Sequence, residues 1–357
     1  MPASFPLPSA DPQSQQEGIL PGVSRTFALT IPQLPQTLRP GITNAYLLCR
    51  TADTIEDSAR LSPADKAEHY DALLRMLDGE IPAAHFAANL LAAAAIPATT
   101  ERDLLGTMPE ILAVYRGLPE SQRRELRRCM GIMCEGMRRF EHLKHPGGLP
   151  DRACLRQYCY VVAGVVGEFL TNLFCQLDDD IDARKAELLH LAPGFGQGLQ
   201  MTNILKDIWD DRQRGICWLP RDVFRDRGCD LSPDAAWHQD PAFRAGLLDL
   251  VAVAHFHLHQ ALHYTQLIPR RHRGIRRFCS WAVGMALYTL RNIRRNPGFS
   301  DSREVKISRR RLRAIIAACN LSVGSDRLQR FGFAWAARGL PEASGPQLAG
   351  LSAEPGP

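Results

Sequence analysis

Apolar residues recur at intervals of three and four along most of this chain, and this spacing constrains the fold more than any other feature. It matches the period of an amphipathic α-helix, which has about 3.6 residues per turn. Sustained alternation of apolar and polar residues, which is typical of strands, is hard to find. We therefore expect an all-α protein with helices over approximately 39–58, 64–78, 100–116, 121–142, 151–176, 183–211, 242–267, 274–295 and 308–320.

Proline and glycine interrupt the helical pattern at several joins: Ser62-Pro63, His145–Gly148, Pro193-Gly194 and Asn296–Gly298. None of these joins resembles a linker, so we expect one large domain over residues 18–339. The flanking segments 1–17 and 340–357 are rich in Pro and Ser and contain no basic residue, which predicts mobile tails.

The glycine-rich segment Gly194–Gly198 follows no credible strand. A dinucleotide-binding loop needs a strand before it and a helix after it. We therefore interpret this segment as a helix break or a site of close helix packing.

Hydrophobic residues make up 45% of the chain and charged residues 23%, which suits a globular protein with a sizeable core. The ten cysteines form no CxxC pair and lie mostly in apolar helical stretches, so we expect reduced core thiols. There is no signal-peptide pattern, and no uninterrupted apolar run approaches the roughly 18 residues of a membrane span. We expect a cytoplasmic protein with no transmembrane segment, for which peripheral membrane contact is an open alternative.

The net charge is +5, and because both flanking segments contribute only acidic residues, the body of the chain is more basic than this value. Arginines cluster at 123–128, 270–277 and 309–313. This distribution suits anionic substrates, acidic lipid surfaces or nucleic acid, whereas the plainer interpretation is a solubilising surface.

Two pairs of aspartates at helical spacing carry the strongest chemical signal: Asp53 with Asp57, and Asp207 with Asp211. Residues four apart lie on one side of a helix, so each pair presents clustered carboxylate oxygens. Such oxygens suit Mg²⁺, which is commonly held by one or two carboxylates together with substrate phosphates and waters. Two facing pairs would form a diphosphate site, and the alternative is two solvated helix faces.

Apolar residues flank both pairs, which favours a functional role because a purely surface helix seldom carries so much apolar surface. The segment Tyr158–Gly167 mixes small and apolar residues. It would either pack closely on another helix or line a cavity for a long hydrocarbon, with the Tyr158 hydroxyl as its polar group. A diphosphate site beside an apolar cavity suits an isoprenoid diphosphate, whose carbocation a dry cavity would protect from water.

With these features in place, the chain resembles the squalene/phytoene synthase family over roughly residues 20–320. The resemblance rests on ordered blocks at Ser24–Phe27, Tyr46–Asp57, Tyr158–Gly167, Gln200–Asp211 and Val305–Ile307. It implies a single-domain isoprenoid synthase helical bundle in which both aspartate-rich helices face a central cavity. The implied reaction is the head-to-head condensation of two farnesyl diphosphates through presqualene diphosphate to squalene, with Mg²⁺ and NADPH as cofactors.

The same resemblance assigns roles to individual residues. The positions that match its two metal-binding motifs are Asp53, Glu56 and Asp57 in the first and Asp207 and Asp211 in the second. Tyr158 matches the tyrosine that handles a proton while presqualene diphosphate forms, and we expect it to be catalytic together with the four aspartates.

A further set of residues matches positions that bind diphosphate or the phosphates of the nicotinamide cofactor: Arg25, Arg50, Lys206 and Lys306, with which we group Asn203. Two departures concern NADPH binding. Lys206 stands where squalene synthases often have Arg, and Lys lacks the bidentate fork of Arg. Ser308 and Arg309 follow the Val305–Ile307 block, where some relatives have another basic residue directly.

Two alternatives remain open at this stage. A non-reductive family member would stop at presqualene diphosphate or make dehydrosqualene or phytoene. A helical protein without catalysis would bind RNA or an acidic membrane surface through its arginines and would not need its paired aspartates. The resemblance favours the enzyme, with farnesyl diphosphate and no nucleic acid as partner.

Overall fold

The computed structural model describes residues 11–24, 26–96, 100–233 and 235–348. Within these residues every regular element is a helix, and an isolated parallel bridge between Leu149 and Pro220 is the only strand-like pairing. The prediction of an all-α protein is confirmed. The chain divides into two compact units, unit 1 (Met1–Arg138) and unit 2 (Arg139–Pro357).

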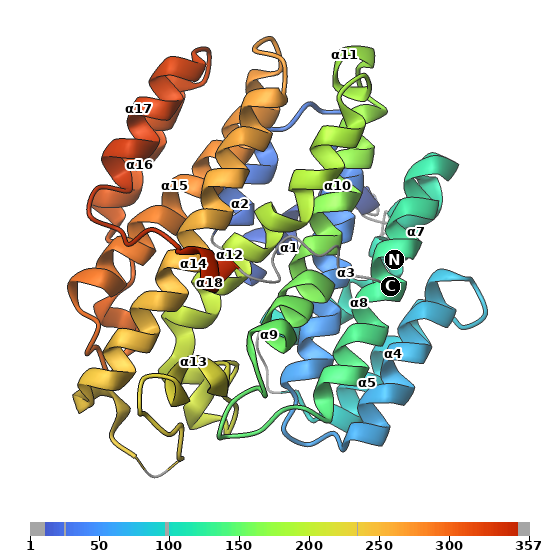
Figure 1. Cartoon of the computed structure of the whole chain (residues 1–357). Coiled ribbons are helices and arrows are strands. Elements are labelled where there is room, and N and C mark those ends of the chain that lie inside the picture. Colours follow the sequence, from blue (N-terminus) through green and yellow to red (C-terminus); the bar gives the residue numbers. More distant parts are fainter. Residues whose placement is uncertain (1–10, 25, 97–99, 234, 349–357) are drawn as a thin grey trace, which may run out of the picture. The chain divides into compact units, whose positions relative to one another are not determined.

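Unit 1 is built around α3, the helix that carries the first aspartate pair (Figure 1). The apolar side of α3 is fully buried and packs on neighbouring helices of the same unit. The elements of unit 1 are α1 (Pro12–Val23), α2 (Phe27–Thr30), η1 (Ile31–Gln33), α3 (Arg39–Asp57), α4 (Pro63–Leu77), α5 (Ala83–Ala94), α6 (Thr100–Gly106), α7 (Met108–Gly117) and most of α8 (Glu120–Glu141).

The amino-terminal boundary differs from the expected tail over residues 1–17, because α1 begins at Pro12. The Asp11 side chain caps this helix by accepting a hydrogen bond from the Ser14 N–H. Gln16 is buried, donates to the Pro40 carbonyl at 3.1 Å and accepts a hydrogen bond from Asn44 at 3.1 Å. Polar contacts with α3 therefore hold α1 in place, and residues 1–10 lie outside the described part.

Unit 2 is built around the long helix α12, which packs most extensively on α14 and also on α10 and α15. Its elements are the end of α8, α9 (Arg152–Cys159), a π-helix η2 (Tyr160–Gly164), α10 (Val165–Cys175), α11 (Asp179–Asp182), α12 (Lys185–Gln213), α13 (Arg221–Arg225), η3 (Trp237–Gln239), α14 (Pro241–Leu267), α15 (Arg273–Arg295), η4 (Ser302–Glu304), α16 (Arg309–Ser322), α17 (Asp326–Ala336) and α18 (Gly345–Leu348). The short helix α18 falls inside the segment expected to be a carboxy-terminal tail.

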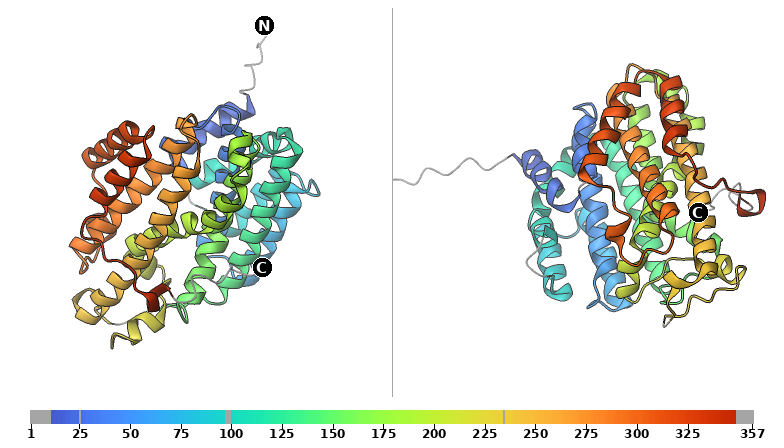
Figure 2. Two further views of the ribbon diagram at one scale, coloured as in Figure 1. Left: turned by 45° about the horizontal axis from the view of Figure 1, so that its top comes forward. Right: turned by 90° about the vertical axis from the view of Figure 1, so that its left-hand side faces the viewer.

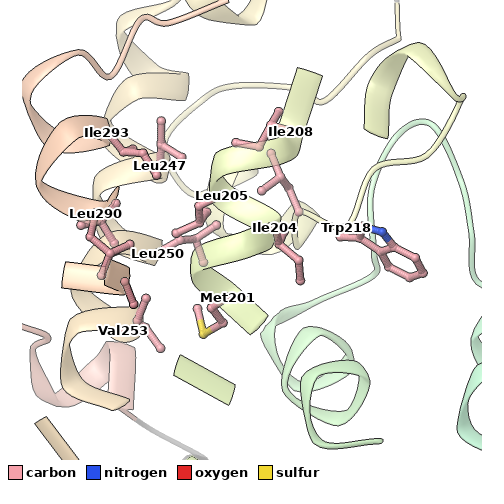
Figure 3. Close-up of a cluster of buried hydrophobic side chains, with 14 of the residues drawn as sticks. Met201, Ile204, Leu205, Ile208, Trp218, Leu247, Leu250, Val253, Leu290 and Ile293 are labelled. Carbon is pink, nitrogen blue, oxygen red and sulfur yellow. The ribbon is translucent and has the colours of Figure 1, made fainter. Parts of the chain in front are cut away.

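Apolar side chains of α12, α14 and α15 meet in one buried cluster (Figure 3). Met201, Leu205 and Ile208 of α12 lie among leucines and isoleucines of the two neighbouring helices. This packing holds the carboxy-terminal half of α12, which carries the second aspartate pair, in a defined orientation within unit 2.

Of the two expectations for this stretch, the helix over 183–211 is confirmed and the break at Pro193-Gly194 is wrong, since α12 runs through both residues. An internal proline normally costs a hydrogen bond and disturbs the helix. Here tertiary packing compensates, because α12 lies very close to η2 and α10. A Cβ atom at Gly196 would overlap the Ala163 carbonyl, and one at Gly167 would overlap the Ala192 carbonyl. Close helix packing therefore accounts for the glycine-rich segment.

Two further expectations concern cysteines and membrane spans. All ten cysteines are free thiols, as predicted. Within the described residues one segment, Arg152–Cys175, has the length and composition of a membrane span, and 50% of its most apolar window is buried in the protein. Because buried core helices meet the same criterion, this segment is weak evidence for a span.

Candidate functional site

The first aspartate pair lies on one face of α3. Tyr46, Arg50, Asp53 and Asp57 follow one another at intervals of three and four, so their side chains lie along a single stripe of the helix. The Tyr46 hydroxyl donates to the Val23 carbonyl at 3.0 Å. This stripe is the part of unit 1 that matches the expected diphosphate-binding motif.

The Tyr46 ring packs on Phe27 with ring centroids 4.8 Å apart. This contact ties the segment after α1 to the same face of α3. The segment contains the predicted cofactor-binding residue Arg25, which itself lies outside the described residues.

Arg50 connects the first pair to a neighbouring helix. Its guanidinium contacts Glu101 at 2.9 Å and Asp53 at 3.8 Å. The ion pair with Glu101 positions the Arg50 cation beside the aspartates rather than out in solvent. Arg50 and Asp53, which the sequence analysis assigned to the same site, are thus brought together within unit 1.

The Asp53 carboxyl has an unusual environment. Its pKa is raised to about 6, first by the loss of solvent around it and then by the negative charge of Asp57, while Arg50 acts in the opposite direction. The side chain is still 42% accessible, so protein atoms crowd it on some sides and leave others open. Crowded carboxylates that repel each other are stabilised by a nearby cation.

Glu56 has a different environment from the two aspartates. Its side chain is buried, whereas Asp57 is exposed. The Glu56 backbone carbonyl accepts a hydrogen bond from the Lys66 ammonium at 2.8 Å. Glu56 is therefore less accessible to solvent than the two aspartates, and the role of Glu56 as a metal ligand stays a prediction.

The second motif places a cation and a carboxylate side by side on α12. The Lys206 ammonium lies 3.0 Å from the Asp207 carboxylate and donates to the Asn203 side-chain oxygen at 3.3 Å. Three predicted site residues therefore form one polar cluster. The cluster is partly exposed, so an anionic ligand would reach it without displacing the core.

Asp211 lies one turn further along α12 and is buried. It forms an ion pair with Arg214 at 2.5 Å. Asp207 and Asp211 are thus each paired with a cation of their own helix or of the turn that follows it. A metal ion at this pair would compete with those cations for the same oxygens.

Asp210 and Ser302 were missed in the sequence analysis, although they connect α12 to a predicted site residue. The Ser302 hydroxyl donates to Asp210 at 2.8 Å and accepts a hydrogen bond from the Lys306 ammonium at 2.9 Å. The signal for Asp210 was present, because it stands three residues after Asp207 in the same motif. Nothing local marks Ser302, since its partner lies 92 residues away in the sequence.

Tyr158 is buried in the apolar cluster of unit 2. Its ring stacks on Trp218 with centroids 3.8 Å apart and planes at 11°, and Phe140 contacts it edge-on at 5.3 Å. The Lys144 ammonium lies 5.9 Å from the Trp218 ring. The tyrosine ring is therefore held firmly in the last turn of α9. The π-helix Tyr160–Gly164 follows this turn, and such helices are frequent near functional sites.

The sequence left open whether the segment Tyr158–Gly167 packs closely on another helix or lines a cavity, and the structure shows both in different parts of the segment. Gly167 packs directly against the α12 backbone. A cavity of about 70 Å³ in unit 2 has Leu155, Cys159 and Met201 among its lining residues. Ligand pockets for substrates of this size are typically several hundred Å³, so this cavity by itself would not hold a farnesyl chain.

Within the described residues no group of three or more His, Cys, Asp or Glu side chains is gathered closely enough to hold a metal ion. The carboxylates are arranged as two separate pairs, one on α3 in unit 1 and one on α12 in unit 2. An ion at either pair would need further ligands from a substrate or from water.

A family model described as squalene/phytoene synthase matches residues 20–311. Squalene synthase of Candida albicans is 29% identical over 280 residues, which are 77% of this chain and 60% of that protein. A squalene synthase of Botryococcus braunii is 30% identical over 285 residues, which are 76% of this chain and 56% of that protein. The chain thus matches 60% or less of the length of these relatives.

The fold also matches a solved structure, that of TcSQS with the ligand BPH1237. The TM-score is 0.68 at 22% identity, and the match covers 92% of this chain and 98% of the other. At this level of identity the likeness concerns the fold alone, and it confirms the expected all-α isoprenoid synthase fold.

Proposed function

This chain belongs to the squalene/phytoene synthase family, and from that premise we propose that it is a Mg²⁺-dependent prenyltransferase that joins two farnesyl diphosphates head to head. In the proposed reaction one C–O bond breaks and the diphosphate leaves with the bonding electrons. The allylic cation then adds to the double bond of the second substrate, and loss of a proton closes the cyclopropane of presqualene diphosphate. We further propose that the second diphosphate then leaves with its bonding electrons, and that the resulting cation rearranges and accepts a hydride, which NADPH would supply, to give squalene.

The two-sided character of α12 is the observation that best supports this proposal. One side presents Asn203, Lys206 and Asp207 as a polar cluster. The other side is part of a buried apolar cluster (Figure 3). Tyr158 belongs to the same cluster. A substrate with an anionic head and a hydrocarbon tail needs both environments within a short distance of each other.

The paired carboxylates fit Mg²⁺. They supply hard oxygen donors with no thiolate or imidazole among them, and they leave positions open for phosphate oxygens and water. We propose Asp53 and Asp57 in unit 1 and Asp207 and Asp211 in unit 2 as the protein ligands. When bound, Mg²⁺ would neutralise charge on the departing diphosphate. Arg50 in unit 1 and Lys206 in unit 2 would each contact phosphate oxygens directly.

Tyr158 would accept or relay the proton that is lost when the cyclopropane closes. Its ring cannot turn freely between Trp218 and Phe140, so its hydroxyl has a fixed position relative to α12. The aromatic rings around it would also exclude water from a carbocation. The rings of Trp218 and Phe140 would therefore both orient the Tyr158 hydroxyl and keep water away from the carbocation.

Lys306 is the residue of unit 2 that we propose for the phosphates of NADPH. Through Ser302 it is connected to Asp210, so its ammonium is held beside the acidic motif of α12. Arg25 and Arg50 of unit 1 are the other cationic residues proposed for diphosphate or cofactor phosphates. NADPH, when bound, would supply the hydride for the reductive half of the reaction.

Product analysis tests the proposal. The purified full chain is incubated with farnesyl diphosphate and Mg²⁺, with and without NADPH, and the products are identified by mass spectrometry. We expect presqualene diphosphate without NADPH and squalene with it. A product that does not change with NADPH would reject the reductive step, and the absence of any coupled product would reject the prenyltransferase.

One observation favours the non-reductive alternative for the second half of the reaction. Lys206 forms an ion pair with Asp207 on its own helix and lacks the planar, bidentate fork of an arginine. Presqualene diphosphate, dehydrosqualene or phytoene would then be the product. The same incubation separates presqualene diphosphate from dehydrosqualene by mass, and phytoene is tested in a second incubation with geranylgeranyl diphosphate in place of farnesyl diphosphate.

A further inference from the structure

The helical hairpin formed by α16 and α17 exposes large apolar side chains. Within the described residues five large hydrophobic side chains are exposed, and four of them belong to this hairpin: Leu321, Leu328, Phe331 and Trp335. Leu321 is 82% exposed and Phe331 is 71% exposed. Figure 2 shows the two helices side by side at the red end of the chain.

Three of these side chains, Leu328, Phe331 and Trp335, form an exposed stripe along α17 that is separate from the buried face of this helix. Residues 328, 331 and 335 fall within about 60° of arc on a helix with 100° per residue. The other side of α17 is already in use, because Phe333 stacks on His255 at 5.9 Å and contacts His259 at 5.6 Å. The exposed stripe is therefore additional to the apolar surface that attaches α17 to unit 2.

Arginines surround the stripe. The span 309–338 contains one acidic residue and seven arginines: Arg309, Arg310, Arg311, Arg313, Arg327, Arg330 and Arg338. The acidic residue, Asp326, is already engaged by Arg270 at 2.6 Å and Arg276 at 2.5 Å. The hairpin therefore presents exposed apolar groups in a strongly positive setting.

Trp335 is oriented by its neighbours. The Arg291 guanidinium lies 5.7 Å from the Trp335 ring and 5.8 Å from the Tyr288 ring, and the two rings are 6.3 Å apart. The Arg311 guanidinium lies 5.3 Å from Tyr288. Aromatic rings beside cations are the arrangement that favours the boundary between lipid headgroups and acyl chains.

From these observations we propose that the α16–α17 hairpin docks on the surface of an anionic phospholipid bilayer, with Leu321, Leu328, Phe331 and Trp335 inserted below the headgroups. Apolar insertion combined with attraction between arginines and anionic lipids is the physical basis of such peripheral binding. The 11 residues of α17 are far fewer than the roughly 20 needed to cross a bilayer. The hairpin would therefore lie in the interface.

Charge favours a membrane over a second copy of this chain. A symmetric dimer that covers both stripes would place two arginine-rich hairpins against each other, and like charges across an interface are unfavourable. An anionic bilayer neutralises the same arginines while it buries the same apolar side chains. The inference does not depend on the proposed catalytic function, since binding to vesicles needs no turnover.

Vesicle flotation tests the proposal with the full chain. The probes are vesicles of phosphatidylcholine alone and of phosphatidylcholine mixed with phosphatidylglycerol. We expect binding only to the anionic vesicles, with an affinity that falls as salt is raised. The double variant Phe331→Ser/Trp335→Ser should bind about a hundredfold more weakly, because two inserted aromatic side chains are lost. Leu29→Ser, which changes an exposed leucine of unit 1, should bind like the parent.

Tryptophan quenching gives an independent readout. The chain has five tryptophans, of which Trp335 is exposed while Trp209, Trp218, Trp237 and Trp281 are buried. Lipids with a quencher near the headgroup should therefore quench the parent and leave Trp335→Phe largely unquenched.

Three outcomes would overturn the proposal. The first is equal binding of the parent and the double variant. The second is no binding to anionic vesicles, or equal binding to both vesicle types. The third is a parent that sediments as a dimer while the double variant is a monomer, which would assign the stripe to self-association. Far-UV circular dichroism of each variant confirms that the exposed substitutions leave the fold intact.

Discussion

Tyr158 and Trp218 lie face to face, with ring centroids 3.8 Å apart and ring planes at 11°. The stack comes from two segments that are distant in the sequence, and it fixes the direction of the phenol within the apolar cluster of unit 2. The orientation of the phenol and its chemistry can be tested separately. A substitution at Tyr158 can remove the hydroxyl alone, and a substitution at Trp218 can remove the ring that orients it.

Tyr158→Phe should lower the rate of presqualene diphosphate formation by about 10² to 10⁴-fold, the usual contribution of a proton-transfer group. Its thermal unfolding midpoint should stay close to that of the parent, because the phenyl ring keeps the stack. Trp218→Ala should lower both the rate and the stability, the latter by about 3–5 kcal/mol for a buried aromatic residue. An unchanged rate for Tyr158→Phe would exclude the tyrosine from the chemistry.

Asp53→Asn and Asp207→Asn should each reduce turnover by about a hundredfold or more and raise the Mg²⁺ concentration needed for half-maximal rate. The expectation follows from the loss of one negatively charged ligand oxygen at each pair. Asp103→Asn in unit 1 and Asp179→Asn in unit 2 are matched controls, since both residues are exposed and lie outside the two motifs. Equal loss of activity in the controls would show that the effect is one of net charge.

Lys306→Met should raise the KM for NADPH by about 10 to 100-fold, as expected for the loss of one charge-assisted contact to a phosphate. Formation of presqualene diphosphate without NADPH should be unaffected. Ser302→Ala should give a smaller increase, because it removes the hydrogen bond that positions Lys306 and leaves the ammonium in place. If Lys306→Met slows the first half-reaction equally, the residue binds substrate diphosphate and not the cofactor.

His257 should make the protein less stable in mild acid. Burial lowers its pKa to about 4; nearby Arg156 acts in the same direction, while its hydrogen bond to Gln260 opposes the shift. The unfolded chain binds a proton below about pH 6.5 and the folded chain does not until about pH 4. Stability is therefore fully present above pH 6.5 and falls by about 3 kcal/mol as the pH drops toward 4. Denaturant titrations of the parent and His257→Gln at several pH values should show a shallower loss in the variant.

Gly196→Ala should destabilise the protein by about 1–3 kcal/mol or more, because the added methyl group overlaps the Ala163 carbonyl. Gly18→Ala is the matched control, since Gly18 is also inside a helix and has open space where a Cβ would lie. It should be neutral or stabilise by up to about 1 kcal/mol. Similar stability of the two variants would argue against the close contact between α12 and η2.

Most long helices follow from the sequence because their apolar period is strong. The expected spans 39–58, 242–267 and 274–295 agree with α3, α14 and α15 to within one residue at each end. The expected helix 100–116 is instead divided into α6 and α7, and Pro109 at the start of α7 accounts for the division. The helix α5 was missed because its alanine-rich sequence has little contrast between its faces.

The sequence alone determined the spacing of the carboxylates along α3 and α12 and the membership in a family, since both depend on local order in the chain. It could not determine the close approach of α12 to η2 at Gly196, the burial of Gln16 or the hydrogen bonds from Lys306 through Ser302 to Asp210. Those features depend on which surfaces meet after the helices have packed. The apolar period of a helix can be recognised from residues within two turns of one another. The contact between Ser302 and Asp210, which are 92 residues apart, exists only in the folded unit.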